Sequence, residues 1–124
     1  MSVLLDSDIV IEVLRARDRS ILEKWTALIA SGEEVLFSPI TSAEIWEGAR
    51  PSEHREIIAC FDLLQCVDID YPTGRLAGDL LREYRKSRGV ELPDAMIAAT
   101  AIQYGAALWT RNRKHYPMPQ VTFY

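Results

Sequence analysis

Several features that define broad classes of protein are missing from this sequence. Only 2 of its 124 residues are cysteines, Cys60 and Cys66, and they form no CxxC pair. A disulfide-rich secreted scaffold is therefore excluded, and we expect reduced thiols in a cytoplasmic protein. No apolar run approaches the roughly 20 residues of a membrane-spanning helix. The chain also does not open on a basic segment followed by a long apolar stretch, so we expect no secretory signal.

Positive charge is not in excess either. The formal net charge is −4, which argues weakly against a nucleic-acid-binding protein. This average conceals an asymmetry along the chain. Residues 1–74 carry 14 acids and 6 bases, residues 75–124 carry 4 acids and 8 bases, and no acid follows Asp94. A surface of this kind can hold a phosphate backbone on one side and a basic partner on the other.

Short apolar runs alternate with amphipathic stretches and predict an α/β fold. Hydrophobic residues make up 48% of the sequence, which is sufficient for one compact domain over 1–124. The pattern predicts a mainly parallel sheet of four or five strands flanked by helices. We expect strands at 3–5, 34–38, 66–70, 106–110 and, at an edge, 121–123. We expect helices at 8–15, 19–30, 41–49, 51–64, 73–88 and 92–105.

The first predicted strand is followed by more acidic side chains than a helix cap needs. The run Val3–Leu5 is typical of a buried parallel strand, and Asp6, Ser7 and Asp8 come directly after it. In open α/β sheets the carboxyl ends of the strands open into the ligand crevice. Ser7 or Asp8 is expected to cap the next helix, which needs only one short polar residue. The remaining carboxylate indicates a cation or a substrate.

Two more acids are expected at the same end of the sheet. Glu44 follows the second strand, where Thr41 and Glu44 match a capping box. Asp94 follows Pro93 at a helix start, where negative charge is favoured by about 0.3–1 kcal/mol. Capping explains each acid singly, but together with Asp6 they predict carboxylates at one mouth of the sheet. Such groups repel one another unless a hard cation such as Mg²⁺ or Mn²⁺ lies among them. Metal-bound water is then a nucleophile suited to phosphate.

Four stretches of the chain, in this order, resemble the PIN domain and specifically the VapC-type toxins of bacterial toxin–antitoxin pairs. They are Leu4–Asp8, Thr41–Ile45, Leu92–Ala101 and Thr110–Asn112. The resemblance implies a PIN-like three-layer fold and a Mg²⁺- or Mn²⁺-dependent endoribonuclease that cleaves RNA phosphodiester bonds with a metal-activated water. It also implies a homodimer that a cognate antitoxin protein holds inactive.

The resemblance also implies the catalytic residues. By position, Asp6, Glu44 and Asp94 match the acids of the family, with Asp6 and Asp94 as metal ligands. Asn112 falls near the fourth, more variable polar position, where an acid is often found. Because no acid follows Asp94 in this chain, Asn112 could supply only an amide oxygen or orient a water there. Occupancy of a second metal site is thereby left open.

Other polar residues near these positions are candidates for supporting roles. Those expected to surround the acids are Ser7, Asp8, Glu12, Glu47 and Thr110. A basic loop follows the fourth predicted strand, and it consists of Arg111, Arg113, Lys114 and His115. Its position suits contact with an RNA backbone, although an ordinary solvated surface would have the same composition.

Two other functions are compatible with parts of the pattern. Asp6 followed by Asp8 after an apolar strand also fits haloacid-dehalogenase-type phosphatases, with Asp6 as a covalent nucleophile. That fold needs an acidic motif after a late strand, and Thr110–Asn112 contains no acid. The second alternative is a catalytically degenerate PIN scaffold that only binds RNA or protein. A binding module of that kind has no need of three acids that repel one another.

We expect the chain to form a homodimer. The helices expected to carry Trp25, Trp46 and Phe61 offer more apolar surface than a chain of this size readily hides. Two-fold dimers are the commonest soluble oligomers.

Overall fold

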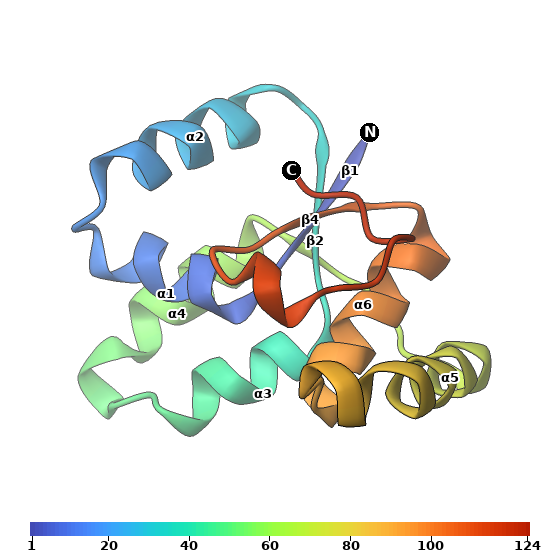
Figure 1. Cartoon of the computed structure of the whole chain (residues 1–124). Coiled ribbons are helices and arrows are strands. Elements are labelled where there is room, and N and C mark those ends of the chain that lie inside the picture. Colours follow the sequence, from blue (N-terminus) through green and yellow to red (C-terminus); the bar gives the residue numbers. More distant parts are fainter.

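The computed structural model describes all residues from 1 to 124 and contains a four-stranded parallel sheet (Figure 1). The strands are β1 (Ser2–Leu5), β2 (Glu34–Phe37), β3 (Gln65–Cys66) and β4 (Ala107–Trp109). Their order across the sheet is β3-β2-β1-β4. The first strand of the chain is therefore an inner strand, paired with β2 on one side and with β4 on the other.

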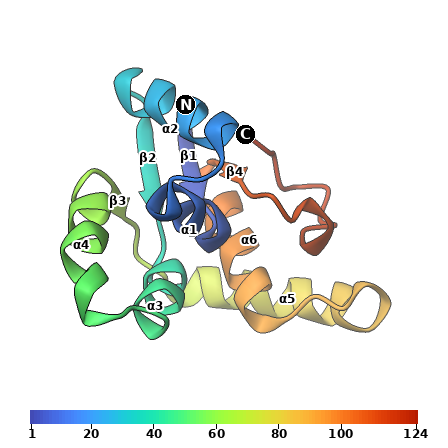
Figure 2. The ribbon, with the colours of Figure 1, turned by 90° about the vertical axis from the view of Figure 1, so that its left-hand side faces the viewer.

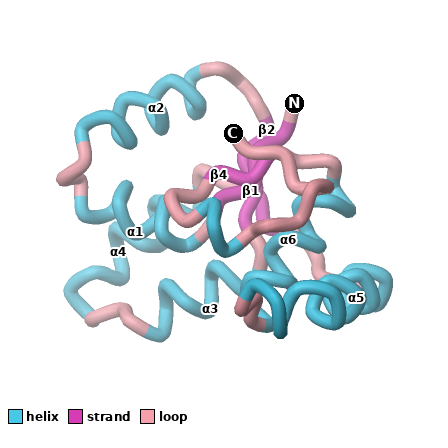
Figure 3. Tube along the Cα trace, viewed as in Figure 1, coloured by secondary structure: helices cyan, strands magenta, loops and turns pink.

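Helices connect successive strands. They are α1 (Ser7–Arg15), α2 (Arg19–Ala30), α3 (Pro39–Glu47), α4 (His54–Asp62), α5 (Tyr71–Arg88) and α6 (Leu92–Tyr104). Short 3₁₀ turns, η1 (Pro51–Glu53) and η2 (Arg113–His115), precede α4 and follow β4. Figures 2 and 3 show α1 to α4 on one side of the strands and α5 and α6 on the other. No helix is both long and apolar enough to cross a membrane.

The core consists of two hydrophobic clusters, one on each face of the sheet. Because side chains alternate along a strand, neighbouring residues of β1 belong to different clusters. Leu4 packs with α5 and α6, whereas Val3 and Leu5 pack with α1, α2, α3 and α4. All three are fully buried, and burying a leucine contributes about 1.5–3 kcal/mol. The predicted three-layer α/β fold is confirmed.

Two predicted strands are much shorter than the sequence pattern indicates, and β2 and β4 are shorter by one and two residues. The strand expected at 66–70 is limited to Gln65–Cys66, because the partner strand β2 ends before Pro39 and its last carbonyl, on Phe37, accepts from Val67 N at 2.9 Å. The expected edge strand at 121–123 forms only an isolated parallel bridge between Leu108 and Phe123.

Four helix starts also differ from the prediction, that of α1 by a single residue, since it begins at Ser7. The third helix begins at Pro39, with Ser38 as its N-cap, so the expected capping box of Thr41 with Glu44 is wrong. Thr41 is instead fully buried, and its hydroxyl donates to the carbonyl of Leu5 at 3.3 Å. This bond joins α3 to the end of β1. The helix expected at 51–64 is divided into η1 and α4, and α5 begins two residues early, at Tyr71.

Candidate active site

A cavity of about 210 Å³ lies where β1 and β4 end. It is lined by Asp6, Ser7, Asp8, Glu44, Pro93, Asp94, Ile97, Asn112, His115 and Tyr116. The three acids and the amide expected to form the catalytic set therefore share one cavity. They come from four different places in the fold: the end of β1, α3, the start of α6 and the loop after β4.

Asp6 is held by hydrogen bonds to both of its carboxylate oxygens. Oδ1 accepts from the backbone N–H of Ser7 at 2.8 Å, which makes Asp6 the N-cap of α1. The sequence prediction that Ser7 or Asp8 caps this helix is wrong. Oδ2 accepts from the hydroxyl of Thr110 at 2.9 Å and from the hydroxyl of Tyr116 at 2.7 Å. Asp6 is buried, so these donors compensate for its lost hydration.

Asp8 lies beside Asp6 and binds the loop that follows β4. Its Oδ2 accepts from the backbone N–H of Arg111 at 2.8 Å and from the side-chain amide of Asn112 at 3.1 Å. Its Oδ1 is buried and has no hydrogen-bond partner. Burial raises the pKa of Asp8, and the neighbouring charge of Asp6 raises it further. Through its hydrogen bond to Oδ2, the side-chain amide nitrogen of Asn112 holds the carboxylate of Asp8.

Glu44 and Asp94 face the same cavity from two helices. Burial raises the pKa of Glu44, and the charges of Asp6 and Asp94 add to this effect, which a hydrogen bond from Ser7 opposes. Asp94 lies in the first turn of α6, where its carboxylate accepts from Glu91 N at 3.5 Å. Burial raises the pKa of Asp94, against the effects of Glu91 N–H and of the His115 imidazole. The carboxylates therefore lie close enough to disfavour one another's ionisation.

The donors in this cavity fit a hard divalent cation. They are carboxylate, amide and hydroxyl oxygens, which are the ligands that Mg²⁺ and Mn²⁺ prefer. No three histidine, cysteine or acidic side chains form a preassembled metal site. Mg²⁺ is usually bound through one or two carboxylates and keeps several waters.

Several candidates from the sequence lie outside the cavity. Glu12 forms ion pairs with Arg111 at 3.1 Å and with Arg15 at 3.6 Å, so it anchors the β4 loop to α1. Glu47 is exposed and lines no part of the cavity. Arg113 lies over the ring of Phe123 at 4.9 Å. Of the basic loop, only His115 lines the cavity, with Nδ1 at 4.0 Å from Asp94.

Tyr116 is the residue that sequence reasoning missed. It is buried and belongs to the cluster that packs against α5 and α6, so in the sequence it looks like an ordinary core aromatic. Burial raises the pKa of its phenol, and the charge of Asp6 raises it further. Nothing in the local sequence indicates that its hydroxyl reaches an acid 110 positions earlier.

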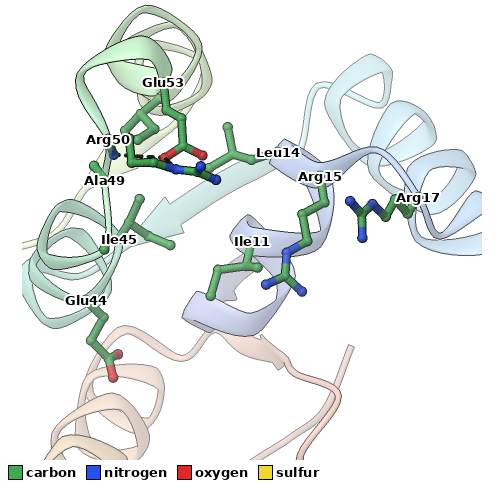
Figure 4. A pocket seen from close by; sticks show the side chains of 11 residues that line it. Ile11, Leu14, Arg15, Arg17, Glu44, Ile45, Ala49, Arg50 and Glu53 are labelled. Atoms are coloured by element: carbon green, nitrogen blue, oxygen red, sulfur yellow. Dashed lines mark hydrogen bonds and ion pairs between the residues drawn. The ribbon is translucent and has the colours of Figure 1, made fainter.

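A second cavity, of about 620 Å³, lies next to the first between α1, α3 and η1 (Figure 4). Its lining is apolar at Ile11, Leu14, Ile45, Ala49 and Ile57 and charged at Arg15, Arg17, Glu44, Arg50 and Glu53. Glu44 lines both cavities. In Figure 4 its carboxyl group is turned away from the arginines. We call this second cavity the α1–α3 groove.

Comparison with known proteins identifies the family. Residues 3–120 match the PIN domain. This chain belongs to the PIN-domain family. Ribonuclease VapC19 of Mycobacterium tuberculosis is 35% identical over 116 residues, which are 93% of this chain and 92% of that protein. The phosphatase alternative has no support from this assignment.

Solved structures agree with the PIN fold. VapBC2 from Rickettsia felis, bound to a DNA fragment from its promoter, matches with a TM-score of 0.85 at 20% identity, covering 100% of this chain and 98% of that one. A toxin–antitoxin complex from Klebsiella pneumoniae matches with a TM-score of 0.76 at 27% identity, covering 97% and 95%. The resemblance of the four sequence stretches to PIN domains of the VapC type is thereby confirmed.

Proposed function

We propose that this PIN-domain protein is the endoribonuclease toxin of a toxin–antitoxin pair and that it acts in the cytoplasm on RNA. The observation that carries the proposal is the convergence of Asp6, Glu44 and Asp94 on one cavity. Each of these residues comes from a separate element, and capping alone does not require that they meet. The 35% identity to a protein named ribonuclease VapC19 supports the same activity.

We propose that Asp6 and Asp94 hold Mg²⁺ or Mn²⁺. The ion would supply an activated water and neutralise charge on the scissile phosphate. Glu44 would accept the proton of the attacking water, because it lines the same cavity as Asp6 and Asp94. Asn112 would act through Asp8, since its amide holds that carboxylate at 3.1 Å.

The exposed part of the basic loop is proposed to hold the RNA backbone. Arg113 and Lys114 are exposed, and His115 lies at the cavity itself. Lysine and arginine bind phosphates through charge without reading sequence. Arg111 has a different role in this proposal, because its guanidinium is paired with Glu12 and its backbone N–H with Asp8.

Cleavage of a pooled RNA substrate by the purified chain tests this function. We expect internal cuts with Mn²⁺ or Mg²⁺, no cuts with excess chelator, and recovery when metal is restored. Attack by an external water that breaks the bond from phosphorus to the 3′ oxygen leaves the phosphate on the downstream fragment. Attack by the ribose 2′-hydroxyl breaks the bond to the 5′ oxygen and leaves a 2′,3′-cyclic phosphate on the upstream fragment. Binding of RNA without any cleavage would instead support the degenerate scaffold.

We propose that the antitoxin places a segment in the α1–α3 groove. The floor of the groove is apolar, with Ile11 and Ile45. Its rim carries Arg17, Arg15, which also pairs with Glu12 at 3.6 Å, and Arg50, which pairs with Glu53 at 3.5 Å. Figure 4 shows Arg15 extending from the end of α1, Arg17 from the connection between α1 and α2, and Arg50 from the turn before η1. A segment with apolar anchors and flanking acids fits this surface. Because Glu44 lines both cavities, such a segment would end at the catalytic acids.

Ile11→Asp is expected to weaken antitoxin binding at least tenfold without loss of RNA cleavage. Ile11 is 36% exposed, so the fold tolerates the change, but a charge on the groove floor would be desolvated by a bound segment. Titration with the protein encoded beside this chain measures the affinity. Ile58→Asp is the matched control, because Ile58 is 51% exposed and lies outside the groove. Equal affinity of both variants would place the antitoxin elsewhere.

The homodimer remains part of the proposal, although one argument for it is weaker than expected. Trp25 and Phe61 are partly buried and pack against the core cluster that contains α1 to α4. Only Trp46 of the three aromatic residues is exposed, at 36%.

A further inference from the structure

We propose that Tyr116 is a positioning residue that restricts Asp6 to one-oxygen metal coordination and thereby makes the site prefer Mg²⁺ and Mn²⁺ over Ca²⁺. This inference rests on the proposed function, since it concerns the ion that the function requires. The juxtaposition that carries it is a buried phenol hydroxyl and a buried threonine hydroxyl on the same oxygen of Asp6.

The hydrogen bonds around Asp6 leave it little free capacity. A carboxylate has two oxygens with about four acceptor positions in all. Both hydroxyl bonds, from Tyr116 at 2.7 Å and from Thr110 at 2.9 Å, end on Oδ2. The backbone N–H of Ser7 takes one position on Oδ1. One position therefore remains free, and it lies on Oδ1.

Tyr116 is well placed to keep this arrangement fixed. Its side chain is 3% exposed and packs in the core cluster with Met118 and Val121. Its backbone N–H donates to the carbonyl of Arg113 at 2.9 Å, which ties it to η2. The hydroxyl donates to Asp6 and to no other group. A phenol in a packed core cannot turn away without opening a cavity.

The remaining position on Oδ1 has a consequence for the choice of metal. Ca²⁺ takes six to eight oxygen ligands and readily accepts both oxygens of one carboxylate. Mg²⁺ takes six ligands at shorter distances and usually binds a carboxylate through one oxygen. With Oδ2 saturated by two hydroxyls, Asp6 can offer only the one-oxygen mode. The tyrosine would thereby disfavour Ca²⁺ without contacting the ion.

Tyr116→Phe tests this inference, because it keeps the ring and removes only the hydroxyl. Binding of Mn²⁺ alone is followed by its electron paramagnetic resonance signal, and Ca²⁺ is then added as a competitor. We expect the ratio of Ca²⁺ to Mn²⁺ affinity to rise about tenfold or more, since groups that hold metal ligands affect affinity on this scale. RNA cleavage is not needed for this readout.

Two further variants make the test specific. Tyr104→Phe is the matched control, because it removes a hydroxyl that donates to the carbonyl of Asp68 at 3.2 Å, outside the cavity. Thr110→Val removes the other donor to Oδ2. It also removes the acceptor of Asn112 N–H at 3.0 Å and a longer contact with Asp8 at 3.5 Å, so it is the less specific of the two variants. It should shift the ratio in the same direction, and it provides the test if Tyr116→Phe fails to fold. An unchanged ratio in variants that bind Mn²⁺ would overturn the inference alone. Failure of the parent chain to bind Mn²⁺ would overturn it together with the proposed function.

Discussion

Asp94→Asn is expected to reduce RNA cleavage by orders of magnitude while leaving the metal-free protein as stable as the parent or more so. The loss of cleavage follows from removing a proposed metal ligand. The unchanged or higher stability of the metal-free variant has an electrostatic cause, because burial and the nearby charge of Asp6 raise the pKa of Asp94. Its ionised form is therefore unfavourable in the metal-free fold, and asparagine removes the charge. The amide oxygen can still accept from Glu91 N.

The pH dependence of melting checks the cause of this effect. A raised pKa means that folded Asp94 takes up a proton more readily than the unfolded chain, whose aspartates titrate near about 3.9. Asp94 carries its unfavourable charge in full at a pH above its raised pKa in the folded protein. At a pH below its pKa in the unfolded chain, it is protonated in both states and the charge is absent. The advantage of Asp94→Asn in the metal-free melting temperature should therefore shrink as the pH falls through that window. Added Mn²⁺ should stabilise the variant less than the parent.

The opposite outcome would identify Asp94 as an ordinary helix residue. An acid that only complements the start of α6 contributes a few tenths to about 1 kcal/mol. Its replacement would lower the melting temperature without metal and leave cleavage at the parental rate. Both measurements on the same preparation therefore separate a metal ligand from a helix cap.

Leu4→Ala is expected to lower the free energy of unfolding by about 2–5 kcal/mol. Leu4 is fully buried on β1, with β2 and β4 on either side and α5 and α6 against its face of the sheet. Its neighbours are held by the sheet and cannot close the space. The free energy of unfolding of natural domains is only about 5–15 kcal/mol, so the variant should unfold at a much lower urea concentration.

A surface leucine provides the control for this prediction. Leu63 is 59% exposed, and Leu63→Ala should change the unfolding free energy by no more than about 0.5 kcal/mol. Urea unfolding of both variants, followed by circular dichroism, gives the comparison. Equal midpoints for the two variants would mean that β1 is not the packed centre of the sheet.

The sequence alone determined the type and order of most secondary structure. The alternation of apolar runs with amphipathic stretches is a local signal, because a strand repeats every two residues and a helix every 3.6. The predicted range 19–30 is that of α2. Asp6, Glu44 and Asp94 could likewise be placed near one end of the sheet, since parallel strands share the direction of their carboxyl ends. The four stretches that resemble PIN domains added the implied chemistry.

Only the tertiary structure decided which groups bind these acids. The hydroxyl of Tyr116 reaches Asp6 across 110 positions and the amide of Asn112 reaches Asp8 across 104. Both contacts exist because β4 pairs directly with β1, an order that local periodicity does not encode. The role of Thr41 changed for the same reason, since its bond to Leu5 depends on where α3 lies against β1. Local patterns fix backbone conformation, whereas hydrogen-bond partners depend on which distant strands become neighbours.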